Sequence, residues 1–240
     1  VEELVEHLGN ADMFCCSCQC FHEENKIQIR SHFYDGDRIF VTAQEKEAFY
    51  SQLMDGAYMQ VGTPYTAIGV PWGKLYRRDF LNTYQIRFYP ELKRMQDNIF
   101  NMEAAFYANE IRYIDEPLYC YRLNNIVQYN VKPYSPEIYS AVLLHRQQIM
   151  AFYIKTYSKE LEELYNQEKL NLLWLSIKHI AMSVSFPVFR KKAAELMERE
   201  IFDCVYEKKT LLRKCGVKFR VFSLMIQLKW YRYLYWYCNR

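Results

Sequence analysis

Short apolar runs and near-alternation of apolar and polar positions dominate the first third of the chain. Residues 11–21 are rich in cysteine and phenylalanine and predict a buried strand, and the apolar spacing in 27–33 predicts a second strand. The polar residues 23–25 between them predict a hairpin. Residues 45–55 have helical spacing and are followed by a glycine, which predicts the end of that helix. This order of elements is typical of an α/β fold.

The middle of the chain continues with short elements of both types. Residues 78–81 fit one helical turn, and a strong helical pattern covers 97–109. Two short strands are predicted next, at 111–114 and 118–122, because the Glu-Pro pair at 116–117 interrupts the apolar pattern. The α/β pattern therefore extends through this part of the chain.

The second half of the chain changes to long helices without a strand signal. Apolar residues recur at helical spacing over four segments, which are 137–157, 159–184, 188–208 and 217–238. Pro187 and Gly216 are breaks between these segments. We therefore place a domain boundary near residue 132, with an α/β part at 1–132 and a helical part at 133–240.

The beginning of the chain lies inside a helical pattern. Residues 1–8 have helical spacing, and Gly9 predicts where that helix ends. Because the pattern is already under way at Val1, which is not a methionine, we expect further sequence before it and interpret the chain as a fragment.

Composition indicates a folded protein with an uneven distribution of charge. Hydrophobic residues make up 51% of the 240 residues, which is enough for a buried core, and the aromatic share of 17% is high. The net charge is +3, but the segment 208–240 holds nine Lys or Arg and no acid, so the preceding 207 residues carry −6. This asymmetry predicts that the C-terminal end meets an anionic surface, such as lipid headgroups or nucleic acid.

The eight cysteines indicate reduced thiols rather than disulfides. Neighbours such as Cys15 and Cys16 point to opposite faces of a strand, which makes them poor disulfide partners. One strand face would carry four candidate zinc ligands: Cys16, Cys18, Cys20 and His22. Because the outer two lie roughly 20 Å apart on a strand, one zinc ion cannot reach them all, and a buried strand of thiols is favoured. Together with the lack of an apolar run long enough to span a bilayer, reduced thiols predict a cytoplasmic protein.

Two motifs occur in a fixed order within the first half of the chain. The first is 71–81, with the sequence PWGKLYRRDFL. The second is 96–101, QDNIFN, followed by 111–122, IRYIDEPLYCYR. In this order and spacing they resemble family 2 glycosyltransferases of the GT-A fold, especially those that build bacterial surface polysaccharides. Residues 1–12 are similar to the helix and strand that follow the metal-binding acidic motif of that family, and the resemblance covers roughly residues 1–125.

The resemblance implies a fold class and a reaction. The fold is α/β, with a partial GT-A-like (Rossmann-like) half followed by an all-helical C-terminal region. The reaction is the inverting transfer of a sugar from a nucleotide-sugar donor to a hydroxyl of a lipid-linked or polysaccharide acceptor. In the family an Asp-x-Asp motif binds a divalent metal, Mg or Mn, and we expect that motif and the donor-binding half before Val1. Residues 35–37, Asp-Gly-Asp, match the Asp-x-Asp pattern but are interpreted as an exposed turn. No metal ligand is therefore assigned in this chain.

The resemblance assigns the catalytic base to Asp97. An alcohol is a poor nucleophile until its proton is leaving, so inverting transfer needs a base beside the acceptor hydroxyl. The family shows Glu-Asp where this chain has Gln96 and Asp97, which is a departure at the first acid. The alternative interpretation of Asp97 is a helix N-cap that accepts backbone N–H bonds, and both roles are compatible.

The same motifs supply four candidate substrate-binding residues. Trp72 and Tyr76 could present ring faces to a sugar or a base, and Lys74 could meet phosphate oxygens. Packing in the core is the alternative, favoured for Tyr76, whereas substrate contact is favoured for Trp72 and Lys74. Arg122 could pair with Asp97 or with a diphosphate, or it could form a structural ion pair.

The basic C-terminal segment also carries an aromatic pattern. On one continuous helix Lys218, Lys229 and Arg232 fall within about 60° of each other, and Trp230 and Trp236 add aromatic area beside them. This composition suits an interfacial helix on anionic lipid, with a packed terminal helix as the alternative. We therefore expect a peripheral protein at the inner face of the cell membrane.

Three functional hypotheses follow from the sequence, of which the third is a helical nucleic-acid binder. The first is a glycosyltransferase whose partners are a nucleotide sugar, a lipid-linked or polysaccharide acceptor and a membrane surface, without nucleic acid. The second is a non-catalytic, membrane-docked interaction module. The second is motivated by the missing metal motif and by Gln96 in place of an acid.

Overall fold

The computed structural model describes residues 2–21, 28–54, 69–122, 134–153, 159–203 and 205–239 of the 240-residue chain. The chain divides into two compact units. The first contains Val1–Pro90, Met95–Tyr129 and Gln148–Ser158, and the second contains Glu91–Arg94, Asn130–Gln147 and Lys159–Arg240. The boundary expected near residue 132 lies outside the described residues.

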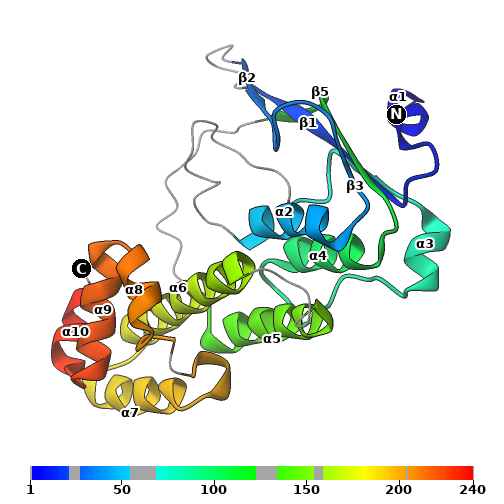
Figure 1. Ribbon diagram of the computed structural model, residues 1–240. Coiled ribbons are helices and arrows are strands. Elements are labelled where there is room, and N and C mark those ends of the chain that lie inside the picture. The colour runs from blue at the N-terminus through cyan, green and yellow to red at the C-terminus, as the bar shows by residue number, and fades with distance from the viewer. Residues whose placement is uncertain are drawn as a thin grey trace. The chain divides into compact units, whose positions relative to one another are not determined.

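The first unit is built on a mixed five-stranded sheet (Figure 1). The strand order is β2 (Gln28–Ser31), β1 (Met13–Phe21), β5 (Ile111–Arg122) and β3 (Arg38–Phe40), and β4 (Lys74–Tyr76) also pairs with β1. β1 is almost entirely buried, as its run of cysteine and phenylalanine predicts. β1 and β2 pair antiparallel, which confirms the pairing expected for the first two strands, while the turn at 23–25 lies outside the described residues. The predicted α/β class with a helical C-terminal region is confirmed.

β5 is one continuous strand, so the prediction of two short strands at 111–114 and 118–122 is wrong. β5 runs parallel to β1, and the register of this pair shifts between Cys16 and Cys18. Pro117 lies opposite this shift and has no backbone N–H to donate to the ladder. The proline therefore displaces the register without ending the strand, because pairing with β1 resumes at Tyr119.

Among the described residues, four helices lie wholly within the sheet unit, and all four match predicted segments. They are α1 (Glu2–Leu8), α2 (Ala43–Met54), α3 (Arg78–Thr83) and α4 (Gln96–Tyr107). α1 ends at Gly9, whose φ of 53° lies in the left-handed region that glycine tolerates. α2 and α4 lie side by side on one face of the sheet and bury apolar residues such as Phe49 and Ile99 (Figure 1).

The second half of the chain is helical, as predicted. Its helices are α5 (Pro136–Tyr153), α6 (Lys159–Ser183), α7 (Phe186–Met197), the 3₁₀ helix η2 (Glu200–Phe202), α8 (Lys209–Lys214), α9 (Val217–Gln227) and α10 (Tyr231–Cys238). α5 and α6 match the predicted segments 137–157 and 159–184. The continuous helices predicted at 188–208 and 217–238 are wrong, because the backbone turns extended at Arg199 and left-handed at Lys229. Over the described residues, none of the helices has the length and apolar character needed to cross a bilayer.

Candidate functional site

β4 places two predicted site residues on the same side of the sheet. It pairs antiparallel with β1, with Lys74 opposite Cys15 and Tyr76 opposite Met13. Because side chains alternate along a strand, Lys74 and Tyr76 point to the same face. Lys74 is buried, and its ammonium donates a hydrogen bond of 2.5 Å to the carbonyl of Val70. Such a buried ammonium is held in a fixed position, unlike a lysine on the surface.

Asp97 lies in the first turn of α4. The N-cap position belongs to Met95, whose φ of 60° and ψ of 17° are left-handed, so the interpretation of Asp97 as the N-cap residue is wrong. Asp97 Oδ1 instead accepts the backbone N–H of Asn98 at 2.9 Å. The partial positive charge of the helix start favours a carboxylate at this position. The side chain is half-buried, which leaves it partly open to an incoming molecule.

Asn101 connects β4 to the first turn of α4. Its side chain is completely buried, and its amide Nδ2 donates to the carbonyls of Asp97 at 2.7 Å and Gly69 at 3.0 Å. Its Oδ1 accepts the hydroxyl of Tyr76 at 2.7 Å. These three bonds fix the turn that carries Asp97 relative to the strand that carries Tyr76. Sequence analysis did not single out Asn101, although a polar residue within the apolar run of α4 was an available signal.

Asp97 lies close enough to Lys74 and Tyr76 to act on both electrostatically. Burial lowers the pKa of the Lys74 ammonium, while neighbouring Cys15, Cys16 and Asp97 act in the opposite direction. Burial also raises the pKa of Tyr76 well above its ordinary value, and Cys15 and Asp97 add to the rise. Tyr76 therefore keeps its proton at neutral pH and remains a donor to Asn101. The structure thus brings the predicted residues Lys74, Tyr76 and Asp97 together.

Trp72 stacks on tyrosines of β5. Its ring centroid lies 4.7 Å from that of Tyr119 and 4.7 Å from that of Tyr121, with interplanar angles of 16° and 14°. The three rings pack against the buried Cys18 and Cys20 of β1. The indole of Trp72 is half-buried and already takes part in packing, so its predicted contact with a sugar stays a prediction.

Arg122 lies at the far end of β5. It pairs in register with Phe21, and its guanidinium lies 5.9 Å from the centroid of the Phe21 ring. The β1 partner of Lys74 is Cys15, six residues earlier, which corresponds to roughly 20 Å along the strand. The structure therefore places the backbone of Arg122 well away from that of Lys74, and the predicted binding of a diphosphate by Arg122 stays a prediction.

The described part of the chain does not offer the ligands of the metal that the resemblance implies. Within it there is no group of three or more His, Cys, Asp or Glu placed to hold a metal ion. The Asp-Gly-Asp segment forms a bend in which Gly36 has a φ of 73°. Asp37 Oδ1 accepts the backbone N–H of Asp115 at 2.9 Å, so this acid anchors the bend to β5.

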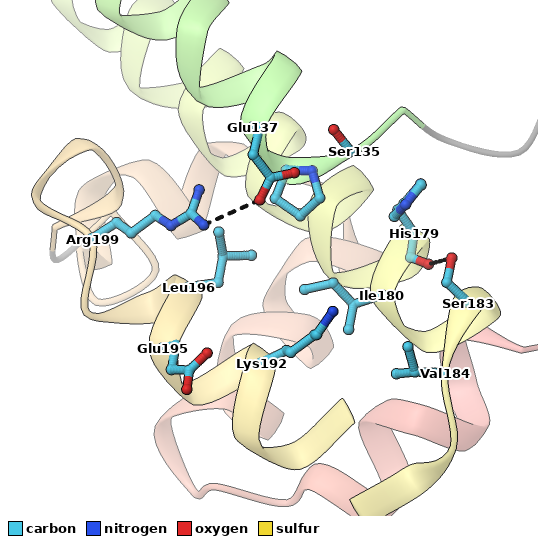
Figure 2. A pocket seen from close by; sticks show the side chains of 11 residues that line it. Ser135, Glu137, His179, Ile180, Ser183, Val184, Lys192, Glu195, Leu196 and Arg199 are labelled. Carbon is cyan, nitrogen blue, oxygen red and sulfur yellow. Dashed lines mark hydrogen bonds and ion pairs between the residues drawn. The ribbon is translucent and has the colours of Figure 1, made fainter. Parts of the chain in front are cut away.

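A pocket of about 210 Å³ lies among α5, α6 and α7 (Figure 2). Its wall combines apolar side chains such as Ile180 and Leu196 with charged groups of both signs. Arg199 and Glu137 form an ion pair of 3.3 Å on one side, and Lys192 points into the space in Figure 2. The sequence did not reveal this pocket, because its α5 residues precede those of α6 and α7 by more than forty positions.

The C-terminal residues expected at a membrane lie on α9, on α10 and in the short connection between them. Because the chain breaks between α9 and α10, the clustering of Lys218 with Lys229 and Arg232 on one helix is wrong. The ammonium of Lys218 lies 4.6 Å from the ring centroid of Trp174 and packs against its own unit. Trp230 and Trp236 remain exposed, as do Lys229 and Arg232.

Comparison with known proteins finds part of the chain similar to a glycosyltransferase. A stretch of 89 residues, 35% of this chain, carries the match at 34% identity. The relative is EpsH of Bacillus subtilis (strain 168), a protein assigned as a glycosyltransferase by inference, and the stretch covers 23% of its length. This match confirms the resemblance to glycosyltransferases noted in the sequence. No protein-family profile matches the chain.

Solved structures give a weaker likeness. The crystal structure of S. aureus TarS 1-349 in complex with UDP-GlcNAc is 14% identical, with a TM-score of 0.40, over 90% of this chain and 64% of that chain. The complex of TarS 1-349 with UDP is 13% identical, with a TM-score of 0.38, over 90% of this chain and 63% of that chain. These scores are too low to support a statement about chemistry. The chain spans less than two thirds of each of these relatives.

Proposed function

We propose that this chain is the acceptor-side portion of an inverting family 2 glycosyltransferase. It would act with a nucleotide-sugar donor on a hydroxyl of a lipid-linked or polysaccharide acceptor, with the donor diphosphate and its metal bound by residues outside the described part of the chain. The observation that carries the proposal is the position of Asp97 at the start of α4, in a turn that Asn101 connects by hydrogen bonds to Tyr76 on β4. The similarity of an 89-residue stretch to EpsH supports the class of enzyme.

Asp97 is the base in this proposal. The acceptor oxygen forms a bond to the anomeric carbon as the bond from that carbon to the nucleoside diphosphate breaks on the opposite face. The acceptor hydroxyl loses its proton to the Asp97 carboxylate during this step. The half-buried position of Asp97 permits such contact, and the hydrogen bond from Asn98 holds the carboxylate in place.

Asn101 and Tyr76 act as positioning residues. Asn101 donates to the backbone carbonyl of Asp97, and Tyr76 donates to Asn101, so a shift of either changes where the carboxylate points. Lys74 is buried and bonded to Val70, which suits a fixed positive charge behind the site better than a mobile contact to substrate. These assignments make Asp97 the one proposed catalytic residue among the described residues.

The test is Asp97→Asn in the protein that contains this chain, assayed for sugar transfer. A general base contributes about 10²- to 10⁴-fold, so we expect a loss of that size in turnover with little change in thermal stability. Asp79→Asn is the matched control, because Asp79 is also a carboxylate in a first helical turn but is exposed and paired with Arg77 at 2.7 Å. Normal turnover by Asp97→Asn would contradict the assignment.

The stereochemistry is tested separately. Nuclear magnetic resonance of the product, recorded before mutarotation, shows whether the anomeric configuration has inverted, and retention would exclude the direct displacement described above. Failure to hydrolyse or transfer from any nucleotide sugar, with the donor-binding part present, would favour the alternative of a non-catalytic interaction module.

The proposal also places the protein at the inner face of the cell membrane. Support comes from the nine Lys or Arg without an acid in 208–240 and from the exposed Trp230 and Trp236. Exposed tryptophan and basic side chains are typical of surfaces that contact headgroups. A lipid-linked acceptor would be presented at that surface.

A further inference from the structure

α9 has an apolar stripe on its outer face. Val217, Val221, Leu224 and Leu228 are 73%, 39%, 50% and 47% exposed. At 100° per residue these positions fall within about 60° of one another on the helix. The buried Phe222 and Ile226 point to the opposite side, so the helix has a packed face and a second, exposed apolar face. The sequence did not reveal that this face of the helix is exposed, because exposure depends on packing.

A basic pocket lies beside the stripe, between α8 and α9. Its volume is about 380 Å³, and its lining is Lys209, Leu212, Arg213, Arg220, Ser223, Leu224 and Gln227. Three of these side chains are cationic and none is acidic. Leu224 belongs both to the stripe and to the pocket, so the apolar and the basic surfaces are continuous.

The three cations of the pocket differ in how they are held. The guanidinium of Arg220 donates to the carbonyls of Leu212 at 3.0 Å and Cys215 at 3.1 Å through Nε, and to that of Arg213 at 2.7 Å through Nη2. This arrangement fixes Arg220 against the end of α8, where a positive charge is favourable. The side chains of Lys209 and Arg213 are exposed and form no ion pair or hydrogen bond within the described part of the chain.

We propose that this pocket binds the phosphate group of an anionic phospholipid while the α9 stripe inserts between the headgroups. The inference rests on the membrane location proposed above and names the surface that makes the contact. A guanidinium group can donate two parallel N–H bonds to phosphate oxygens. The exposed side chains of Lys209 and Arg213 can turn toward a phosphate group bound in the pocket. The stripe supplies the apolar area that an interfacial helix buries at the headgroup boundary.

Charge complementarity favours a membrane over other occupants. The segment 208–240 carries nine cations and no acid, so a second copy of this surface would repel the first. Nucleic acid would satisfy the cations but would leave the stripe of aliphatic side chains without a partner. An anionic bilayer satisfies both the cations and the stripe.

Cosedimentation with vesicles tests the proposal without donor or acceptor, so its result does not depend on sugar transfer. We expect the chain to bind vesicles of phosphatidylcholine mixed with phosphatidylglycerol and to bind vesicles of phosphatidylcholine alone much more weakly. Raising the salt concentration should weaken the binding, because the cations are exposed. Equal binding to both kinds of vesicle, or binding to neither, would overturn the proposal.

Substitutions in the pocket and in the α9 stripe test whether these surfaces contact the vesicles. Arg213→Ala and Lys209→Ala should each weaken vesicle binding about fivefold, whereas Lys191→Ala on α7, which removes the same charge, should have a smaller effect. Leu224→Ser should also weaken binding about fivefold, and the similarly exposed Leu144→Ser on α5 is its control. Circular dichroism checks that the variants remain folded.

Two results would assign the surface to another partner. If Arg213→Ala and Lys191→Ala weaken binding equally, the cations act through net charge and the pocket has no specific role. If single-stranded nucleic acid displaces the chain from anionic vesicles and its own binding survives Leu224→Ser, the basic pocket serves nucleic acid and the proposal is wrong.

Discussion

Arg146 on α5 and Glu168 on α6 form a buried ion pair, with Arg146 Nε 2.7 Å from Glu168 Oε2. The two side chains are 0% and 6% exposed. Burial raises the pKa of Glu168, and the neighbouring guanidinium opposes that rise. Each charge is therefore tolerated in the interior because the other is present.

Glu168→Gln is expected to destabilise the helical unit strongly. The amide has nearly the same shape but removes the negative charge that lies against the buried Arg146 guanidinium, and breaking a buried ion pair in this way costs about 3–5 kcal/mol. Urea denaturation followed by circular dichroism measures the loss. The control is Glu195→Gln, because Glu195 pairs with Lys191 at 3.8 Å on the surface and such pairs contribute about 1 kcal/mol or less. Similar losses in the two variants would contradict the assignment.

Tyr76→Phe is expected to uncouple β4 from α4. It removes the hydroxyl that donates to Asn101 Oδ1, and a buried acceptor left without a donor costs about 1–3 kcal/mol. Tyr89→Phe is a matched control, since the hydroxyl of Tyr89 donates to the carboxyl group of Glu103 at 3.1 Å at a partly buried position.

A double-mutant cycle measures the coupling between Tyr76 and Asn101. Stabilities of Tyr76→Phe, Asn101→Ala and the double variant should depart from additivity, because both residues share one hydrogen bond. In the transfer assay proposed above, Tyr76→Phe should lower turnover more than Tyr89→Phe does. Additive stabilities would show that the bond does not join the two elements.

The sequence predicted those elements of the fold that depend on strong local patterns. β1 has a continuous apolar run, and α2 and α4 have clear helical spacing, so each lies where expected. β5 was divided in the prediction because Pro117 interrupts its pattern. Its continuity depends on pairing with β1 on both sides of the proline, which is a contact between residues almost a hundred positions apart.

The break at Lys229 was missed for a related reason. Neither glycine nor proline marks it, and the left-handed backbone at Lys229 has no local sequence signal. The end of α9 therefore could not be placed, and which apolar face of that helix is exposed depends on its packing against other helices.

The candidate site was predicted only in part. The motifs supplied Lys74, Tyr76 and Asp97, which the structure brings together. They could not supply the role of Asn101, because that role consists of bonds to Gly69 and Tyr76, which precede it by more than twenty residues. The positioning contacts follow from the packing of β4 against α4, which the motifs do not encode.

Cys15 is expected to resist alkylation in the folded protein. Burial raises the pKa of its thiol to about 12, so the reactive thiolate is scarce near neutral pH, and the side chain is covered. Cys120 on β5 is exposed and should react with iodoacetamide first. Mass spectrometry of tryptic peptides after brief labelling measures both sites. Equal labelling without denaturant would show that β1 is more accessible than the structure implies.

Lys74→Met is expected to separate stability from activity. The methionine side chain fills the same space without a buried charge, and although the carbonyl of Val70 loses its donor, removal of the buried ammonium offsets that loss. We expect a change in the free energy of unfolding of about 1 kcal/mol or less near pH 7. Turnover in the transfer assay should fall, because the positive charge beside Asp97 is gone.

The pH dependence of the stability of Lys74→Met tests whether burial lowers the pKa of Lys74. Because the folded-state pKa of Lys74 is lowered, the unfolded chain binds more protons than the folded protein between that pKa and the ordinary value of about 10.4. The contribution of Lys74 to stability therefore rises with pH through this window and is lost as pH falls through the folded-state pKa. Thermal unfolding of wild type and variant should show that the stability of the wild type rises relative to that of the variant as the pH increases across the window. A constant difference between wild type and Lys74→Met would mean that burial does not perturb the pKa of this lysine.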